Sequence, residues 1–134
     1  MNEINLDDLF KKAQAAALGA YAPYSKFRVG AALLGENGIV YTGCNVENRS
    51  FGLTICAERT AVTKAVSEGC RFFRAIAIST PDSVVPVGPC GACRQVLSEF
   101  MPSGAPVRFG GSSAERINTT IGELIPFDSL HDLA

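Results

Sequence analysis

The sequence predicts a three-layer α/β fold, in which a mixed sheet of about five strands carries helices on both faces. Two observations support this prediction. Apolar residues recur at helical spacing in some segments and form short strand-like runs in others, and Gly, Pro and Asn separate these segments. Along the chain the segments follow the order α-β-β-α-β-α-β-β-α, which favours one mixed sheet with helices packed against both faces.

The first half of the chain is expected to form a helix, two strands and a second helix, over residues 5–20, 27–34, 39–44 and 56–68. Asn5 is a favourable N-cap for the first helix, which ends before Pro23. The turn Gly-Glu-Asn-Gly joins the two strands, so they form a hairpin. A polar loop follows the hairpin, and Gly69 marks the end of the second helix.

The second half is expected to form a buried strand, a helix, two short strands and a short final helix. These elements lie at residues 74–80, about 90–102, 106–109, 116–118 and just before Pro126. Thr120 and Glu123 have the spacing of a capping box, which predicts that the final helix begins there.

Length and composition indicate one globular domain, 1–134, because 134 residues are too few for two ordinary domains. No apolar run is long enough to span a membrane, and the acidic N-terminus does not resemble a signal peptide. We therefore expect a cytoplasmic protein with no membrane partner. The net charge of −1, with Lys and Arg scattered along the chain, also argues against a nucleic-acid partner.

Five cysteines, an odd number, favour thiolate or metal chemistry over a set of disulfides in such a protein. Cys90 and Cys93 form a C-x-x-C pair at the start of a predicted helix, where free N–H groups and the helix dipole favour thiolates. The same spacing occurs in thioredoxin-like redox motifs, and two ordinary core cysteines are a further alternative. The pair by itself leaves these alternatives open.

A third cysteine, Cys56, opens another predicted helix, and Glu58 follows it by two residues. Three protein ligands would leave one tetrahedral position open, which is the arrangement of catalytic rather than structural zinc. Cys44 could close the site, although no spacing supports that role. The other two candidates are expected elsewhere: His131 in an exposed C-terminal tail and Cys70 as a small buried residue.

The motifs Cys-Ala-Glu at 56–58 and Pro-Cys-Gly-Ala-Cys at 89–93 resemble the signature of the zinc deaminases in its three-cysteine form. Longer stretches, at residues 24–27, 43–48, 54–61 and 89–95, resemble the small cytidine deaminases, and the likeness extends over nearly the whole chain. The resemblance implies a cytidine deaminase-like fold and hydrolysis of free cytidine or deoxycytidine in pyrimidine salvage. It does not indicate which of the two nucleosides is preferred.

The resemblance also implies roles for the residues of the two motifs. Cys56, Cys90 and Cys93 would hold one Zn²⁺ per subunit. Glu58 would act as the catalytic residue, taking a proton from the activated water and delivering protons to ring N3 and the leaving amine. Arg59 would donate hydrogen bonds to the sulfurs, although an arginine on an exposed helix face is an alternative interpretation.

Four further positions would bind the nucleoside in such an enzyme. Asn45 and Glu47 alternate at the end of a strand and would hold the ribose hydroxyls, unless they are merely a turn-forming Asn and an exposed Glu. Phe27 would pack on the pyrimidine ring, or it is a core residue. The main-chain N–H of Ala57, with a carbonyl near Pro89, would bind the edge of the base.

Two positions depart from the family pattern. Phe127 follows Pro126 directly, with fewer residues between them than in relatives that insert a Phe into a neighbouring subunit, and Phe51 replaces a frequent Tyr. Both are candidate inter-subunit residues of the homotetramer that the resemblance implies. Two alternative functions remain at this stage: a deaminase of blasticidin-type nucleoside antibiotics, and a non-catalytic zinc module.

Overall fold

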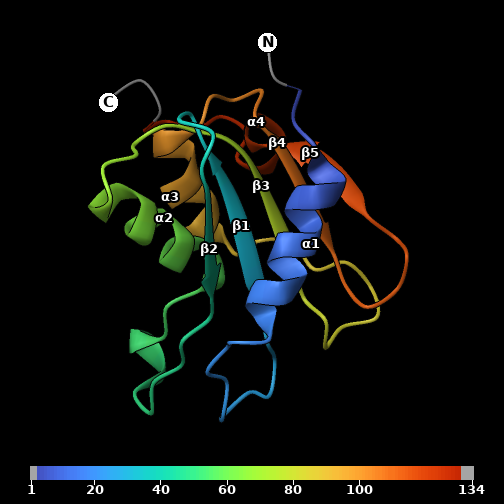
Figure 1. Ribbon diagram of the computed structural model, residues 1–134. Helices are drawn as coiled ribbons and strands as arrows, with labels where there is room; N and C mark the ends of the chain where they lie inside the picture. Colours follow the sequence, from blue (N-terminus) through green and yellow to red (C-terminus); the bar gives the residue numbers. More distant parts are fainter. Residues whose placement is uncertain (1–2, 131–134) are drawn as a thin grey trace.

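Five strands form one mixed sheet in a computed structural model that describes residues 3–130 (Figure 1). The described elements, in chain order, are α1 (Leu6–Ala17), β1 (Gly30–Gly35), β2 (Val40–Cys44), a 3₁₀ turn η1 (Phe51–Leu53), α2 (Ala57–Ser67), β3 (Phe73–Ser79), α3 (Gly91–Phe100), β4 (Pro106–Gly110), β5 (Ile117–Thr120) and α4 (Ile121–Leu124). This order is the one that the sequence predicts. None of the helices within residues 3–130 is long and apolar enough to cross a membrane.

The strands lie in the order β2-β1-β3-β4-β5. Strand β1 is antiparallel to both β2 and β3, β3 is parallel to β4, and β4 is antiparallel to β5. The chain therefore runs in one direction along β2, β3 and β4 and in the other along β1 and β5. As a result, the carboxyl ends of β2 and β3 lie at the same edge of the sheet, together with the start of β1.

Two apolar layers cover the two faces of the sheet. Helix α1 packs on one face, in front of the sheet in Figure 1, against the small side chains of Ala32, Ala75 and Ala77. Helices α2, α3 and α4 pack on the other face, against larger residues such as Leu33, Ile76 and Val107. The predicted three-layer α/β/α arrangement is confirmed.

Two segments differ from the sequence prediction. The first strand begins at Gly30 rather than at residue 27, because the N–H groups of residues 27–29 donate to side chains instead of to a neighbouring strand. Helix α1 ends at Ala17 rather than near residue 20, and its N-cap is Asn5 as predicted, with the Asn5 side chain accepting from Asp8 N at 3.0 Å. The remaining boundaries agree within about two residues, the usual uncertainty of helix and strand ends.

Glycines allow two of the helices to touch the sheet backbone. A Cβ on Gly30 would lie 2.1 Å from the Ala13 carbonyl oxygen of α1, and a Cβ on Gly43 would lie 2.6 Å from the Ala57 carbonyl oxygen of α2. Both distances are far below van der Waals contact, so only glycine fits at these positions. The close contact at Gly43 fixes the first turn of α2 against the end of β2.

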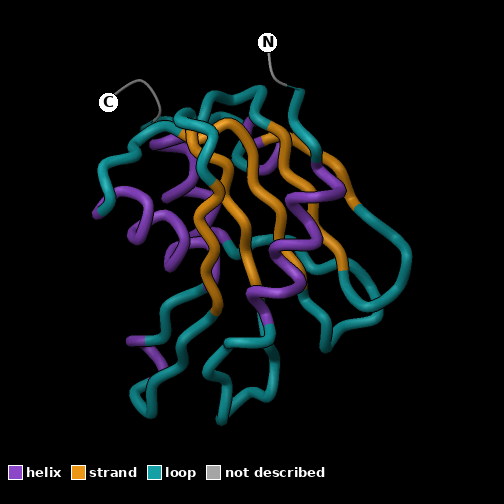
Figure 2. The backbone as a smooth tube through the Cα atoms, in the orientation of Figure 1, coloured by secondary structure: helices purple, strands orange, loops and turns teal. Residues whose placement is uncertain are grey.

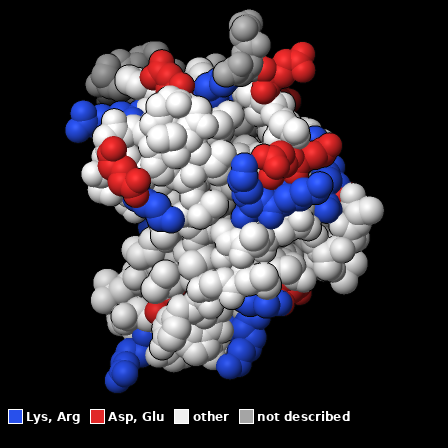
Figure 3. Space-filling model, in the orientation of Figure 1, with Lys and Arg blue, Asp and Glu red and all other residues white. Residues whose placement is uncertain are grey.

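Loops gather at the lower edge of the sheet in Figure 2, where residues 18–29 and 45–56 connect α1 to β1 and β2 to α2. The α1 face carries acidic and basic side chains that are interspersed rather than sorted into a stripe of one sign (Figure 3). The loops at the lower edge leave polar side chains and backbone groups outside the regular packing of helices and strands.

Replacing Gly30 with Ala is expected to lower the free energy of unfolding by about 3 kcal/mol, because the new methyl group can fit only if α1 moves away from the sheet. Denaturant unfolding followed by circular dichroism measures this loss. The matched control is Gly104→Ala, where a Cβ meets nothing within 4 Å. Equal stabilities for the two variants would contradict the close packing of α1 on β1.

Candidate active site and metal centre

The topology brings the N-termini of α2 and α3 to one edge of the sheet. Helix α2 follows β2 through the loop 45–56, and α3 follows β3 through the loop 80–90, and both strands end at that edge. Cys56 is the N-cap of α2 and Cys90 is the N-cap of α3, while Cys93 lies in the first turn of α3. Three cysteines from two helix ends therefore converge because β2 and β3 run in the same direction.

The three sulfur atoms form one cluster, in which all lie within 4.8 Å of one another. The Sγ atoms of Cys56 and Cys90 are 3.9 Å apart, and the backbone N–H of Cys93 donates to the Cys90 Sγ at 3.4 Å. Cys93 is fully buried and Cys90 is exposed, so one side of the cluster faces outward. Within residues 3–130, Cys44 does not join the cluster.

Arg59 neutralises negative charge at the cluster. Its Nη2 donates to the Cys56 Sγ at 3.2 Å, and its Nε is buried without a hydrogen-bond partner among the described residues. A hydrogen bond from the Cys93 thiol, together with Arg59, lowers the pKa of Cys56 to about 5. The Cys56 thiolate and burial in turn raise the pKa of Cys93. The arginine thus points at the sulfurs rather than into solvent.

Glu58 lies in the first turn of α2 with only 4% of its surface exposed. Burial raises the pKa of its carboxyl group to about 7, and the neighbouring Cys56 thiolate adds to this shift. A carboxyl group with such a pKa can both accept and release a proton near neutral pH, as a general acid and base must.

The donor set fits zinc. Two sulfurs on a tetrahedral zinc ion lie about 3.8 Å apart when each Zn–S bond is about 2.3 Å. The separation of 3.9 Å between Cys56 and Cys90 matches that value. Soft thiolate ligands, two helix N-termini and a guanidinium group that offsets the negative charge of three sulfurs all favour the same ion. The site thus has the ligands for one Zn²⁺ per chain.

The side chain of Asn45 bonds to the segment that carries Phe27. Its Oδ1 accepts from Val29 N and its Nδ2 donates to Phe27 O, both at 2.8 Å. Asn45 is buried, and Phe27 is partly buried at the same edge of the sheet. Binding of a ribose hydroxyl by Asn45 stays a prediction.

Glu47 organises the chain just before Phe27. Its Oε1 accepts from Tyr24 N at 3.0 Å and Ser25 N at 3.2 Å, and its Oε2 accepts from the Ser25 hydroxyl, which lowers the pKa of Glu47. Glu47, Tyr24, Ser25, Phe51 and Thr54 line a pocket of about 390 Å³. Phe51 is exposed, and its ring meets the Tyr24 ring edge-on with centroids 5.8 Å apart.

The remaining predicted positions lie as follows. Ala57 is buried as the first residue of α2, and Pro89 O accepts from the Nε of Arg94 at 2.8 Å. Cys70 is buried, and His131 lies outside the described residues.

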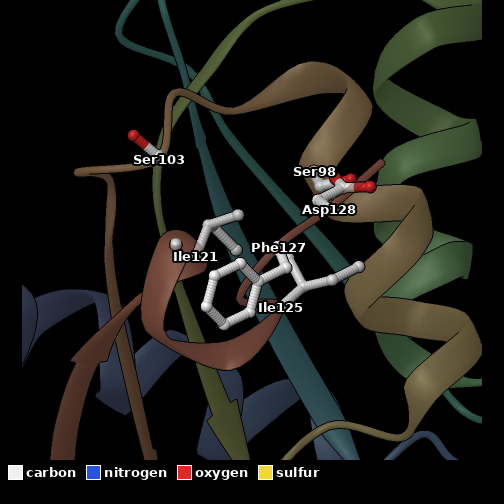
Figure 4. A pocket seen from close by; sticks show the side chains of 7 residues that line it. Ser98, Ser103, Ile121, Ile125, Phe127 and Asp128 are labelled. Carbon is white, nitrogen blue, oxygen red and sulfur yellow. The ribbon is translucent and has the colours of Figure 1, made fainter. Parts of the chain in front are cut away.

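Phe127 is completely exposed and has a left-handed backbone, with φ of 55°. It lies beside Ile121 and Ile125 in a pocket of about 240 Å³, whose other lining residues include Ser98 of α3 (Figure 4). Ser98 belongs to the half of α3 that is remote from Cys90 and Cys93. The structure thus places Phe127 near the far end of α3, and its inter-subunit role stays a prediction.

Three contributors to this edge were not predicted from the sequence. The Ser25 hydroxyl accepts from Phe27 N, and the Asp82 carboxylate accepts from the backbone and the side chain of Arg28, so these residues hold the backbone around Phe27. Ser25 lies within the Tyr-Ser-Lys-Phe stretch, which could have drawn attention to it, whereas Asp82 lies in a loop with no spacing relation to residue 28.

The fold and the cluster define an α/β/α protein with a three-cysteine metal centre beside a buried glutamate. The sequence model of the cytidine and deoxycytidylate deaminase zinc-binding region matches residues 4–107. The chain belongs to this family of zinc-binding deaminases.

Individual relatives agree with this assignment. The chain is 47% identical to a cytidine deaminase of Sporosarcina psychrophila over 123 residues, covering 92% of this chain and 90% of the relative. It is 52% identical to a cytidine deaminase of Halalkalibacterium halodurans over 118 residues, covering 88% and 89%. The crystal structure of a cytidine deaminase from Burkholderia pseudomallei superposes with a TM-score of 0.88 at 44% identity, covering 92% of this chain and 98% of that one. A blasticidin-S deaminase of Bacillus cereus is more distant, at 34% identity over 110 residues and 76% of each chain.

Replacing Arg59 with Ala is expected to weaken zinc binding about 10- to 100-fold, because the sulfurs lose the cation that offsets their negative charge. Competition with a coloured zinc chelator measures the affinity. Arg71→Ala, which removes an exposed arginine just beyond α2, is the matched control and should leave the affinity unchanged. Unchanged affinity in Arg59→Ala would show that Arg59 does not support the metal site.

Proposed function

We propose that this chain is a cytidine deaminase, which hydrolyses cytidine and deoxycytidine to uridine and deoxyuridine with release of ammonia in pyrimidine salvage. The observation that carries the proposal is the position of Glu58, a buried carboxyl group two residues from Cys56 of the three-sulfur cluster, close enough that the Cys56 thiolate raises its pKa. Similarity to cytidine deaminases over about nine-tenths of the chain supports the choice of substrate.

When bound by Cys56, Cys90 and Cys93, a zinc ion supplies the Lewis acidity that makes water a nucleophile near neutral pH. Glu58 takes one proton of the attacking water as its oxygen bonds to C4 of the cytosine ring, and delivers that proton to ring N3. The same carboxyl group then takes the proton of the new C4 hydroxyl group and passes it to the amino group, so the C4 carbonyl forms, the C4–N bond breaks and ammonia leaves. Its raised pKa, about 7, suits it to carry each proton in turn.

The surrounding residues hold the nucleoside in this proposal. Phe27 packs against the pyrimidine ring, and the N–H of Ala57 together with a carbonyl group near Pro89 binds its edge. Asn45 and Glu47 hold the ribose hydroxyls. Each side chain has more hydrogen-bonding positions than its contacts to residues 24–29 use, and the remaining positions bind the sugar. Both residues then serve two purposes, since they also shape the segment that presents Phe27.

We further propose that residues 1–134 form one domain that acts in the cytoplasm as a homotetramer. Exposed aromatic side chains at Phe51 and Phe127 support contacts between subunits, because large apolar groups on a surface favour association. In this assembly, both residues contribute to interfaces next to a neighbouring subunit's site.

Replacing Glu58 with Gln is expected to lower the turnover number for cytidine between about 100-fold and 10,000-fold, because the amide cannot carry a proton. Loss of the ultraviolet absorbance of cytidine follows the reaction. Zinc content, measured on the same samples, should stay at one ion per chain. Glu68→Gln, at the opposite end of α2, is the matched control and should keep full activity.

Three outcomes would contradict the proposal. Unchanged turnover in Glu58→Gln would rule out its role in proton transfer. If zinc-loaded wild-type protein hydrolysed blasticidin S but not cytidine, the chain would be a deaminase of that antibiotic. If it hydrolysed neither compound, a non-catalytic zinc module would be favoured. The far greater similarity to cytidine deaminases favours the nucleoside over the antibiotic.

A further inference from the structure

The three backbone N–H groups of Phe27–Val29 donate to side chains, and two of the acceptors, Asn45 and Asp82, lie far away in the sequence. Phe27 N donates to the Ser25 hydroxyl oxygen at 3.0 Å, Arg28 N donates to Asp82 Oδ2 at 2.8 Å, and Val29 N donates to Asn45 Oδ1 at 2.8 Å. The segment precedes β1 and has no strand partner that would satisfy these N–H groups. Its position therefore depends on the side chains that bind it, together with one backbone bond, from Asn45 N to Val29 O at 3.2 Å.

Asp82 makes the most extensive of these contacts. Besides Arg28 N, its carboxylate accepts from Arg28 Nε at 3.0 Å and from Arg28 Nη2 at 2.8 Å. A carboxylate that engages both a guanidinium fork and the backbone N–H of one residue fixes that residue in orientation as well as in place. The same bonds lower the pKa of Asp82 to about 2, so its charge persists across the physiological range.

The loop that carries Asp82 is itself anchored. Ser112 N donates to Ser83 O at 2.7 Å, and Ser113 N donates to Val84 O at 3.3 Å, which ties the loop to the chain after β4. A Cβ on Gly111 would lie 2.1 Å from Ser83 O, so the two backbones touch. The same loop continues to Cys90. Asp82 thus connects the Phe27 segment to the loop that carries a cysteine of the cluster.

We propose that Asp82 is a positioning residue for the reaction, which fixes Phe27 relative to the cysteine cluster by holding Arg28. This inference rests on the proposed function, in which Phe27 packs against the base. Lys26, with a left-handed φ of 61°, follows the turn at residues 23–25 immediately before Phe27, and Asp82 holds the chain on the other side of that residue. The backbone of Phe27 is thereby held on both sides.

A stabilising surface ion pair is the simpler account of the same contact. Half-exposed ion pairs contribute little to stability, and Arg28 and Asp82 retain 41% and 26% of their side-chain exposure. Such a pair would affect melting temperature slightly and would affect the Michaelis constant not at all. The two accounts therefore predict different measurements.

Steady-state kinetics on zinc-loaded full-length protein separates them. Asp82→Ala is expected to raise KM for cytidine about 10-fold with little change in kcat, since a misplaced Phe27 weakens binding of substrate and transition state alike. Asp82→Asn, which keeps one acceptor oxygen for Arg28 N, should give a smaller increase. The matched control is Asp8→Ala, which breaks the exposed pair between Asp8 and Lys12 on α1 and should leave KM unchanged.

A double-mutant cycle tests whether Asp82 acts through Phe27. In a Phe27→Ala background, the Asp82→Ala substitution should have almost no further effect on KM, because the ring that it positions is gone. Additive effects, or an Asp82→Ala variant with the kinetics of Asp8→Ala, would overturn the inference.

Hydrogen exchange gives a readout that does not need turnover. Mass spectrometry of peptides covering residues 24–30 should show faster amide exchange in Asp82→Ala than in wild type or Asp8→Ala, and unchanged exchange would overturn the inference. Failure of the wild-type protein to convert cytidine would instead reject the proposed function, so the two failures are distinguishable.

Discussion

The common direction of β2 and β3 is the constraint on which the candidate site depends. Because both strands end at one edge of the sheet, the helices that follow them begin there, and their first turns face each other. Each helix start supplies free N–H groups and a cysteine, so the positive ends of two helix dipoles meet three sulfurs. Reversing either strand would separate Cys56 from Cys90 by the length of the sheet.

Close packing of α2 on β2 fixes the position of the first turn of α2. Gly43 lets α2 touch the backbone of β2, which holds the first turn of α2, and with it Glu58, against the end of the strand. Burial then determines the electrostatics: the carboxyl group of Glu58 is desolvated and its pKa rises, while Arg59 offsets the charge of the thiolate next to it. The contact of α2 with β2 at Gly43 thus helps to hold Glu58 in the buried position that raises its pKa.

Side chains replace strand pairing at the other half of the site. The backbone that precedes β1 departs from the sheet, and Ser25, Asn45 and Asp82 satisfy the N–H groups that a neighbouring strand would otherwise bind. A segment that is not paired with a neighbouring strand can turn its side chains toward the cysteine cluster, whereas the side chains of a paired strand must alternate between the two faces of the sheet. This exchange explains the late start of β1.

The sequence by itself determined the order of the helices and strands, because helical periodicity and turn residues are local signals. It also marked the three cysteines and Glu58 as a candidate site, since C-x-x-C spacing and the start of a helix are local signals as well. The resemblance of residues 54–61 and 89–95 to cytidine deaminases extended this to a family. Tertiary structure alone decided which side chains hold Phe27, that Arg59 points at Cys56 and that Phe127 lies exposed near α4. Asp82 and Arg28 are 54 residues apart in sequence, and contacts over such separations follow from how the sheet folds rather than from local pattern.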